Sequence, residues 1–295
     1  MNRSKRLGTL ASTASCLLIV CLCAPAFPAQ TKNPAHQKPD WNDKILPGSP
    51  LTVLELTRKI IPDIKTDPGK AEKVTASDLS GVRLLDGVEE TGMELDPDAG
   101  AECEITDQDY ILMKDGDDTF LVLFLGVDGT KVVTGLFKIS PEVTLLDAVT
   151  IAQDMHADVE PEKVWTIHPR HQAFVVHCWH DNSSESFDQY TFISIVDRKL
   201  RAVADLGGFE GFVTYMPARQ RLCKTAISPK FQFVQSSSPG YLDLIVNAMA
   251  LKACHRDSEE WSWKTGVVYQ KSVRQLWRWD ARKKQYRKAS TGRRR

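Results

Sequence analysis

β-Branched and aromatic residues are most concentrated between residues 172 and 208, where three apolar runs are separated by two short polar segments. Successive side chains of a β-strand point to opposite faces, so the runs QAFVVHCWH and FDQYTFISIV indicate two strands that are apolar on both faces. The segments DNSS and DRK between the runs are typical of turns. The pattern therefore predicts a three-stranded meander, whose third strand is half-solvated near a sheet edge and ends at Gly207 and Gly208.

Similar runs continue on both sides of this meander. Asp128-Gly129 between TFLVLFLG and TKVVTGLFKI is a strong hairpin signal, and a further strand is expected in 143–151. After the meander we expect a strand pair, 221–227 with 230–235, and strands in 241–251, 271–280 and 285–290. An amphipathic helix is predicted over 50–61, with Ser49 as its N-cap and Pro50 as its first residue. Its β-branched residues leave a strand as the alternative.

Strand-like runs recur about every 8–14 residues, with turn signals between them. This spacing predicts a mainly β fold with one short N-terminal helix. The hairpins would form an antiparallel sandwich, or a propeller-like or barrel array. Within it, residues 49–290 are expected to form one mostly-β domain, or two sub-units that meet near 155–165.

The N-terminus has the pattern of a secretory signal peptide. Basic residues precede an apolar stretch, and Ala24-Pro25-Ala26 is a small-x-small site, so cleavage is expected between Ala26 and Phe27. The apolar stretch is short for a retained membrane anchor, and no small residue precedes Cys21 or Cys23 as lipidation would require. Residues 27–48 are expected to form a mobile leader, and residues 291–295 a disordered basic tail.

Charge and hydropathy extend this interpretation. The whole chain carries 38 basic and 38 acidic residues, and three of the basic ones lie in residues 1–26, so the mature net charge is about −3. No later segment reaches the roughly 18 apolar residues of a membrane span. We therefore expect a soluble, exported protein of the bacterial periplasm or exterior that binds no nucleic acid.

Four cysteines remain after cleavage, at positions 103, 178, 223 and 254. An oxidising compartment permits disulfides, and four cysteines allow three pairings. Cys223 with Cys254 is the favoured pair because both lie in the strand-rich C-terminal part. Cys178 lies on a strongly apolar strand, where a buried thiol that packs as a small hydrophobic residue is an equally good prediction.

Histidines are the first candidates for chemistry. His168, His171, His177 and His180 lie within thirteen positions, and zinc accepts histidine ligands. However, His177 and His180 would face opposite sides of one strand, so structural histidines and no metal are favoured. His180 and Asp181 are candidate binding residues. They also suggest a base with its orienting carboxylate, which gives the alternative of a secreted hydrolase with a His/Asp or metal site around His177–Asp181.

The C-terminal part is the second candidate, because residues 264–295 contain 12 Lys or Arg and one acid. Trp277 and Trp279 add stacking surface, so this part is a candidate site for a glycan or another polyanion. The competing explanations are core packing for the tryptophans, and a basic end that complements the acidic residues of 86–118.

Several signatures of common enzymes are missing from the sequence, including a phosphate-binding glycine loop, HExxH and GxSxG. We therefore expect a non-enzymatic binding or envelope-accessory module without a cofactor. Its expected partner is an envelope protein, a glycan or another polyanion. The secreted hydrolase remains the alternative.

Overall fold

The computed structural model describes residues 38–66, 74–76, 79, 81–86, 103–151, 156–159, 164–181, 185–216, 221–236, 240–256 and 266–289. Ala26 and Phe27 of the predicted signal cleavage site lie outside these residues, as does the predicted basic tail.

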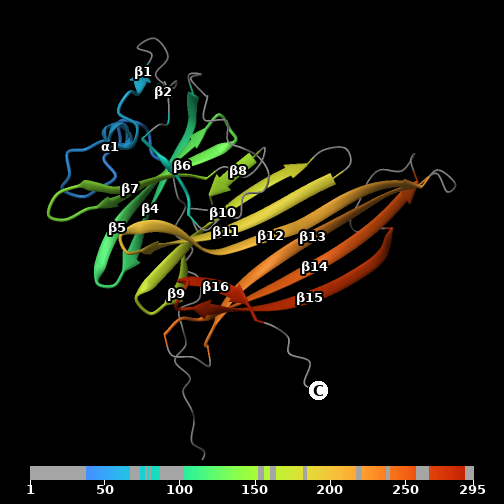
Figure 1. Cartoon of the computed structure of the whole chain (residues 1–295). Coiled ribbons are helices and arrows are strands. Elements are labelled where there is room, and N and C mark those ends of the chain that lie inside the picture. The colour runs from blue at the N-terminus through green and yellow to red at the C-terminus, as the bar shows by residue number, and fades with distance from the viewer. Residues whose placement is uncertain are drawn as a thin grey trace, which may run out of the picture.

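The described residues form one helix and sixteen strands (Figure 1). In chain order they are α1 (Val53–Ile60), β1 (Lys65–Thr66), β2 (Val74–Ala76), β3 (Arg83–Leu84), β4 (Cys103–Asp115), β5 (Asp118–Val127), β6 (Lys131–Lys138), β7 (Thr144–Ile151), β8 (His156–Val159), β9 (Trp165–His168), β10 (His171–Asp181), β11 (Glu185–Val196), β12 (Lys199–Met216), β13 (Arg221–Val234), β14 (Asp243–Arg256), β15 (Val267–Asp280) and β16 (Gln285–Lys288).

All of these strands belong to one sheet, with the order β16-β15-β14-β13-β12-β11-β10-β4-β5-β6-β7-β3 along its main path. Neighbouring strands are antiparallel, except that β3 and β7 are parallel. The path is open, since no ladder joins β16 to β3 among the described strands. The prediction of a mainly β protein with one short N-terminal helix is confirmed, and the folded-over sheet is of the sandwich type.

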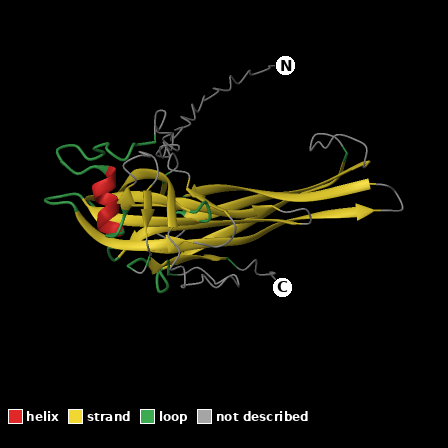
Figure 2. Ribbon diagram, turned by 90° about the horizontal axis from the view of Figure 1, so that it is seen from above, coloured by secondary structure: helices red, strands yellow, loops and turns green. Residues whose placement is uncertain are grey.

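The strands β4–β7 together with α1 form what we call the helix-bearing region (Figure 2), in which β5 and β6 are buried on both faces. One hydrophobic cluster lies between β5–β7 and β10–β12, and a second lies between the other face of these strands and α1. Gly135 on β6 makes the close approach of α1 possible, because a Cβ there would collide with the side chain of Ile60. Runs apolar on both faces, such as TFLVLFLG, have the composition that this double burial requires.

The helix starts later than the sequence pattern predicted. Thr52, not Ser49, is the N-cap, and Pro50 precedes the helix. The Thr52 hydroxyl accepts a hydrogen bond from the backbone N–H of Glu55, and the Glu55 carboxylate accepts one from the backbone N–H of Thr52. This reciprocal capping box satisfies two backbone N–H groups at the start of the helix. A cap at Ser49 lies too far from these two groups to satisfy them.

The chain packs against the sheet before residue 49, where the predicted domain begins. Leu46 is buried in the second cluster, and Trp41 packs against it. The backbone N–H of Val53 donates to the carbonyl of Asp43, so the segment is tied to the start of α1. No helix among the described residues has the length and apolar composition needed to cross a membrane.

An ion pair connects the β3–β7 edge to β12. Arg83 donates from Nε and Nη2 to the two carboxylate oxygens of Asp147, at 3.0 and 2.7 Å. The same carboxylate accepts from the backbone N–H of Leu200 at 2.7 Å, and the Leu200 carbonyl accepts from Arg83 at 2.8 Å. Because Asp147 is buried and its oxygens are all partnered, this contact fixes the start of β12 against the helix-bearing region.

The strand β12 is longer than predicted, because it continues through Gly207 and Gly208 to Met216. Its residues 199–212 pair with β11, and only Val213–Met216 pair with β13, so among the described strands the predicted part has one paired edge, as expected of a strand near a sheet edge. The glycines form a bulge: Tyr190 is paired with Leu206 and Asp188 with Phe209, so two residues of β12 are opposite Gln189. The local sequence of this glycine pair is typical of a turn, but the pair forms a bulge here because pairing with β11 continues beyond it.

The predicted strand pair 221–227 and 230–235 is instead one strand, β13. It pairs with β14 along its whole length, whereas β12 reaches only Arg221–Lys224. Beyond Lys224 no described strand covers the other edge of β13, and an edge strand tolerates a residue without an N–H such as Pro229.

We call the arm the strands β13–β15 together with residues 207–216 of β12 (Figure 1). The arm folds back over β10–β12 and encloses a third hydrophobic cluster, which includes Phe192, Leu206 and Leu244. Cys223 on β13 and Cys254 on β14 are paired in register and joined by a disulfide, as predicted. Cys178 is fully buried in the first cluster.

Candidate functional site

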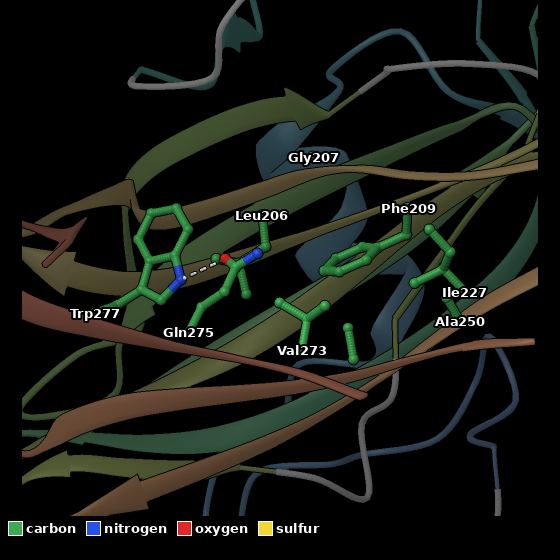
Figure 3. Close-up of a pocket in the computed structure, with 9 residues that line it drawn as sticks. Leu206, Gly207, Phe209, Ile227, Ala250, Val273, Gln275 and Trp277 are labelled. Atoms are coloured by element: carbon green, nitrogen blue, oxygen red, sulfur yellow. Dashed lines mark hydrogen bonds between the residues drawn. The ribbon is translucent and has the colours of Figure 1, made fainter. Parts of the chain in front are cut away.

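A cavity of about 150 Å³ lies between β12 and the inner face of the arm (Figure 3). Its lining is mostly apolar, with one amide side chain. The lining residues are Leu206, Gly207, Phe209, Ile227, Ala248, Ala250, Val273, Gln275 and Trp277.

The bulge in β12 builds one wall of this cavity. Residues two apart on a strand share a face, so Leu206 and Phe209 would point to opposite faces of a regular strand. The extra residue at Gly207-Gly208 restores them to one face, because their partners Tyr190 and Asp188 are two apart. Both side chains therefore face the cavity, as Figure 3 shows.

The opposite wall comes from the alternation along β14 and β15. Val273, Gln275 and Trp277 are each two positions apart, and they are paired in register with Ala248, Val246 and Leu244. The small alanines on β14 leave the space, and the longer side chains of β15 border it. The indole Nε1 of Trp277 donates to the Gln275 side-chain oxygen at 3.3 Å, which fixes both side chains at the wall (Figure 3).

The two predicted tryptophans have different environments. Trp277 lines the cavity, but Trp279 is stacked on Tyr241 with ring centroids 3.8 Å apart and meets Tyr286 edge-on. One face of the Trp279 ring is thus covered by the protein itself. Of the two, only Trp277 borders the cavity.

His168 and His171 lie in a stack of rings at the base of the arm. His168 is 4.8 Å from both His171 and Tyr241, measured between ring centroids. His171 Nδ1 is 2.5 Å from the Asp115 carboxylate. Burial, followed by the charges of His171 and Arg170, lowers the pKa of His168, and burial raises the pKa of Tyr241. The stack joins the β4–β5 turn to the arm.

His177 forms a second pair with a carboxylate, since its Nε2 is 2.6 Å from Asp188 Oδ1 on β11. Its ring is stacked on Tyr190 with centroids 4.3 Å apart and an interplanar angle of 4°. A histidine and carboxylate at this distance can exchange a proton with a bound molecule. A nucleophile would still be needed for hydrolysis.

Ser186 cannot supply that nucleophile to His177. It is in register with Asp181, four positions along β10 from His177, which is about 13 Å at ~3.3 Å per residue. Its hydroxyl lies where a Cβ on Gly211 would be, so it points toward β12.

His180 lies on the other face of β10, in register with Phe187, on whose ring it is stacked with centroids 5.8 Å apart. Its Nε2 is 3.7 Å from Glu185. The side chain of Asp181 lies outside the described residues, so the predicted His180–Asp181 pair stays a prediction. The structure therefore separates His177 from His180 and brings each close to a different acid.

A metal centre has no support in the part of the chain that the structure describes. There, no three histidine, cysteine, aspartate or glutamate side chains lie close enough together to hold an ion. His168 and His171 are close to each other, but their other neighbours are a tyrosine and one aspartate.

Sequence reasoning found one residue of the cavity, Trp277, and missed the rest. The lining comes from four strands spread over residues 206–277, and only the pairing of those strands brings them together. The one local signal was the Gly207-Gly208 pair, which can mark a bulge as well as a turn. No protein-family model, curated protein or solved structure matches the chain.

Proposed function

We propose that the protein is an exported, non-enzymatic binding module that holds a small apolar group in the cavity beneath the arm. The observation that carries this proposal is the cavity itself, which has walls of leucine, isoleucine, valine, alanine and aromatic side chains. A concave, apolar site with a single polar anchor is the usual form of a small-ligand site. The signal-peptide pattern and the disulfide are both consistent with export.

The size of the cavity restricts the ligand. A volume of about 150 Å³ lies below the roughly 300–1,000 Å³ of sites that enclose drug-sized molecules. Apolar cavities of about this volume accept a benzene-sized group. The bound group is therefore a single ring or a short acyl segment, and each buried methylene contributes about 0.8 kcal/mol. A glycan fits less well, because its hydroxyls would find one amide, that of Gln275, in the wall.

Binding of fluorobenzene to the mature protein, followed by ¹⁹F NMR, tests the proposal. Wild-type protein should bind it saturably at one site. Ala250→Leu places three more carbons in the cavity and should abolish binding. Ala226→Leu is the matched control, since Ala226 is on β13 with the opposite facing from Ile227 and should bind like wild type. Absence of saturable binding to wild type, or unchanged binding by Ala250→Leu, would show that the proposal is wrong.

A secreted hydrolase is the second candidate, and the His177–Asp188 distance of 2.6 Å favours it. In that case hydrolysis of 4-nitrophenyl acetate should fall to the background rate in His177→Ala. His180→Ala, on the opposite face of β10, should keep the activity. Equal rates for wild type and His177→Ala would remove this candidate.

A further inference from the structure

The strand β15 has an open edge along most of its length. It pairs with β14 from Val267 to Trp277, whereas β16 covers only the last part, Trp277–Asp280. Among the described strands, none pairs with the remaining stretch, which we call the β15 edge and define as residues 267–276. Its first eight residues are exposed on both faces of the sheet.

Along the β15 edge, the backbone N–H and C=O groups of successive residues point alternately toward β14 and away from it. The carbonyl of Leu276 accepts a hydrogen bond from the N–H of Ala289 on the β16 side, so Leu276 directs its backbone groups away from β14. In an antiparallel ladder this direction repeats every second residue. Arg274, Ser272 and Gln270 therefore also direct their N–H and C=O groups outward, and these are the groups to which an added strand would bind.

Apolar side chains are concentrated at the same place. Of the eight large hydrophobic side chains exposed in the described residues, four are on this strand: Val267, Val268, Tyr269 and Val273. Proteins usually protect an open strand edge with charged side chains such as lysine, a proline, a bulge or a short strand, and the β15 edge has two basic side chains and a bulge at Val268. It is nevertheless long and free of proline, and its exposed apolar side chains are typical of an interaction surface.

The charge of the β15 edge indicates the kind of partner. Lys271 and Arg274 are exposed, and neither forms an ion pair with any described residue. No acidic residue occurs between Val267 and Trp279. A segment that pairs here must place acidic groups next to these two side chains, because like charges on neighbouring strands are destabilising.

The same charges disfavour a second copy of the chain as the occupant. A two-fold antiparallel pairing centred on the β15 edge would bring Lys271 and Arg274 of one copy within a few residue pairs of the same side chains of the other. All four charges would be positive, with no acid on either edge to offset them.

We propose that the β15 edge binds an extended, acidic segment of a partner protein, which adds to the sheet as a further antiparallel or parallel strand. Backbone hydrogen bonds to Gln270, Ser272 and Arg274 supply affinity that is independent of side chains, as in other cases of strand addition. Apolar residues beside Val267 and Tyr269 and acids beside Lys271 and Arg274 supply specificity. The backbone edge is distinct from the cavity, although Val273 and Gln275 of the same strand line the cavity with their side chains, and the proposal goes beyond the function proposed above.

A labelled nine-residue peptide, Val-Glu-Glu-Val-Val-Glu-Glu-Val-Val, is the probe, because as a strand it presents glutamate on both faces, as Lys271 and Arg274 on opposite faces of β15 require. Fluorescence anisotropy with the mature protein is the measurement. Wild type should bind this peptide at least tenfold more tightly than the same peptide with lysine in place of glutamate. Raising the salt concentration should weaken the binding, since the charges are exposed. Failure to bind the acidic peptide, or equal binding of both peptides, overturns the proposal.

Ser272→Pro tests the backbone contribution. Its N–H is directed outward, so the ladder to β14 stays complete, while proline removes one donor and blocks strand addition. We expect at least a tenfold loss of peptide binding with an unchanged circular dichroism spectrum. The matched variant Ser272→Ala keeps the N–H and should bind like wild type. Wild-type affinity in a folded Ser272→Pro protein contradicts the proposal.

Two further variants make the outcome decisive. Arg274→Glu should bind the lysine peptide more tightly than the glutamate peptide. This variant tests the site even if Ser272→Pro fails to fold. Ile227→Phe, which fills the cavity from β13, two strands away from β15, should leave peptide binding unchanged, so failure of the cavity proposal and failure of this one are distinguishable. A wild-type dimer that Ser272→Pro converts to monomer would show that a second copy is the occupant, and would overturn the proposal.

Discussion

The helix-bearing region and the arm are parts of one sheet, yet their burial differs. In the helix-bearing region, β5 and β6 are buried on both faces, by α1 on one side and by β10–β12 on the other. In the arm, β15 is exposed over its first eight residues, and β14 is buried on both faces only over its first four residues. Strands buried on both faces contribute stability but offer no surface, so recognition is expected in the arm.

The largest expected effect is a difference in stability between a truncation in the helix-bearing region and one in the arm. Phe137 on β6 is fully buried in the second cluster, whereas 47% of Tyr269 on β15 is exposed. Phe137→Ala should lower the free energy of unfolding by about 3–5 kcal/mol, because it leaves a cavity in a packed core. Tyr269→Ala should change it by about 0.5 kcal/mol or less. Urea unfolding followed by fluorescence measures both free energies. Equal losses would contradict the contrast between a buried helix-bearing region and an exposed arm.

Removing the disulfide should have the next largest effect. Cys223 and Cys254 are 31 positions apart. A disulfide that closes a loop of that length lowers the conformational entropy of the unfolded chain, and so stabilises the folded state by about 3–4 kcal/mol. The double variant Cys223→Ala/Cys254→Ala should therefore be less stable by about that amount. Reduction of wild type should lower its stability to that of the double variant and should not affect the double variant. A loss near zero would show that the arm is held by packing alone.

The smallest effect concerns pH at the ring stack that joins the two regions. Burial lowers the pKa of His168 in the folded protein, so the unfolded chain takes up a proton at higher pH than the folded one. This histidine therefore lowers the free energy of unfolding once the pH falls below about 6.5, the ordinary pKa of histidine, and does not change it at higher pH. His168→Gln should lose less stability than wild type between pH 7.5 and 5.5. Parallel pH profiles for the two proteins would contradict this expectation.

The hairpins could be predicted from the sequence because their signals are local. Asp128 and Gly129 have positive φ angles, as a tight hairpin between β5 and β6 requires, and the residues on each side alternate as strands do. The same local reasoning was wrong at Gly207-Gly208 and between residues 227 and 230. There, long-range pairing with β11 and β14 overrides a composition that is typical of turns.

The candidate sites were less predictable because they depend on register between distant strands. Asp188 is eleven residues from His177, and nothing in the sequence distinguishes it from the other acids near the meander. Tyr241 reaches His168 only because the arm folds back over β9 and β10. The sequence does place Trp277 and Trp279 on one strand face, but their different environments follow from the neighbours that the fold supplies.

The continuity of β12 has a mechanical consequence. One uninterrupted strand of 18 residues passes from the contact with Arg83 and Asp147 to the far end of the arm. A pull on whatever the arm holds would act along this strand and load its ladder with β11 in shear. The hydrogen bonds of this ladder would then bear the load together instead of opening one after another.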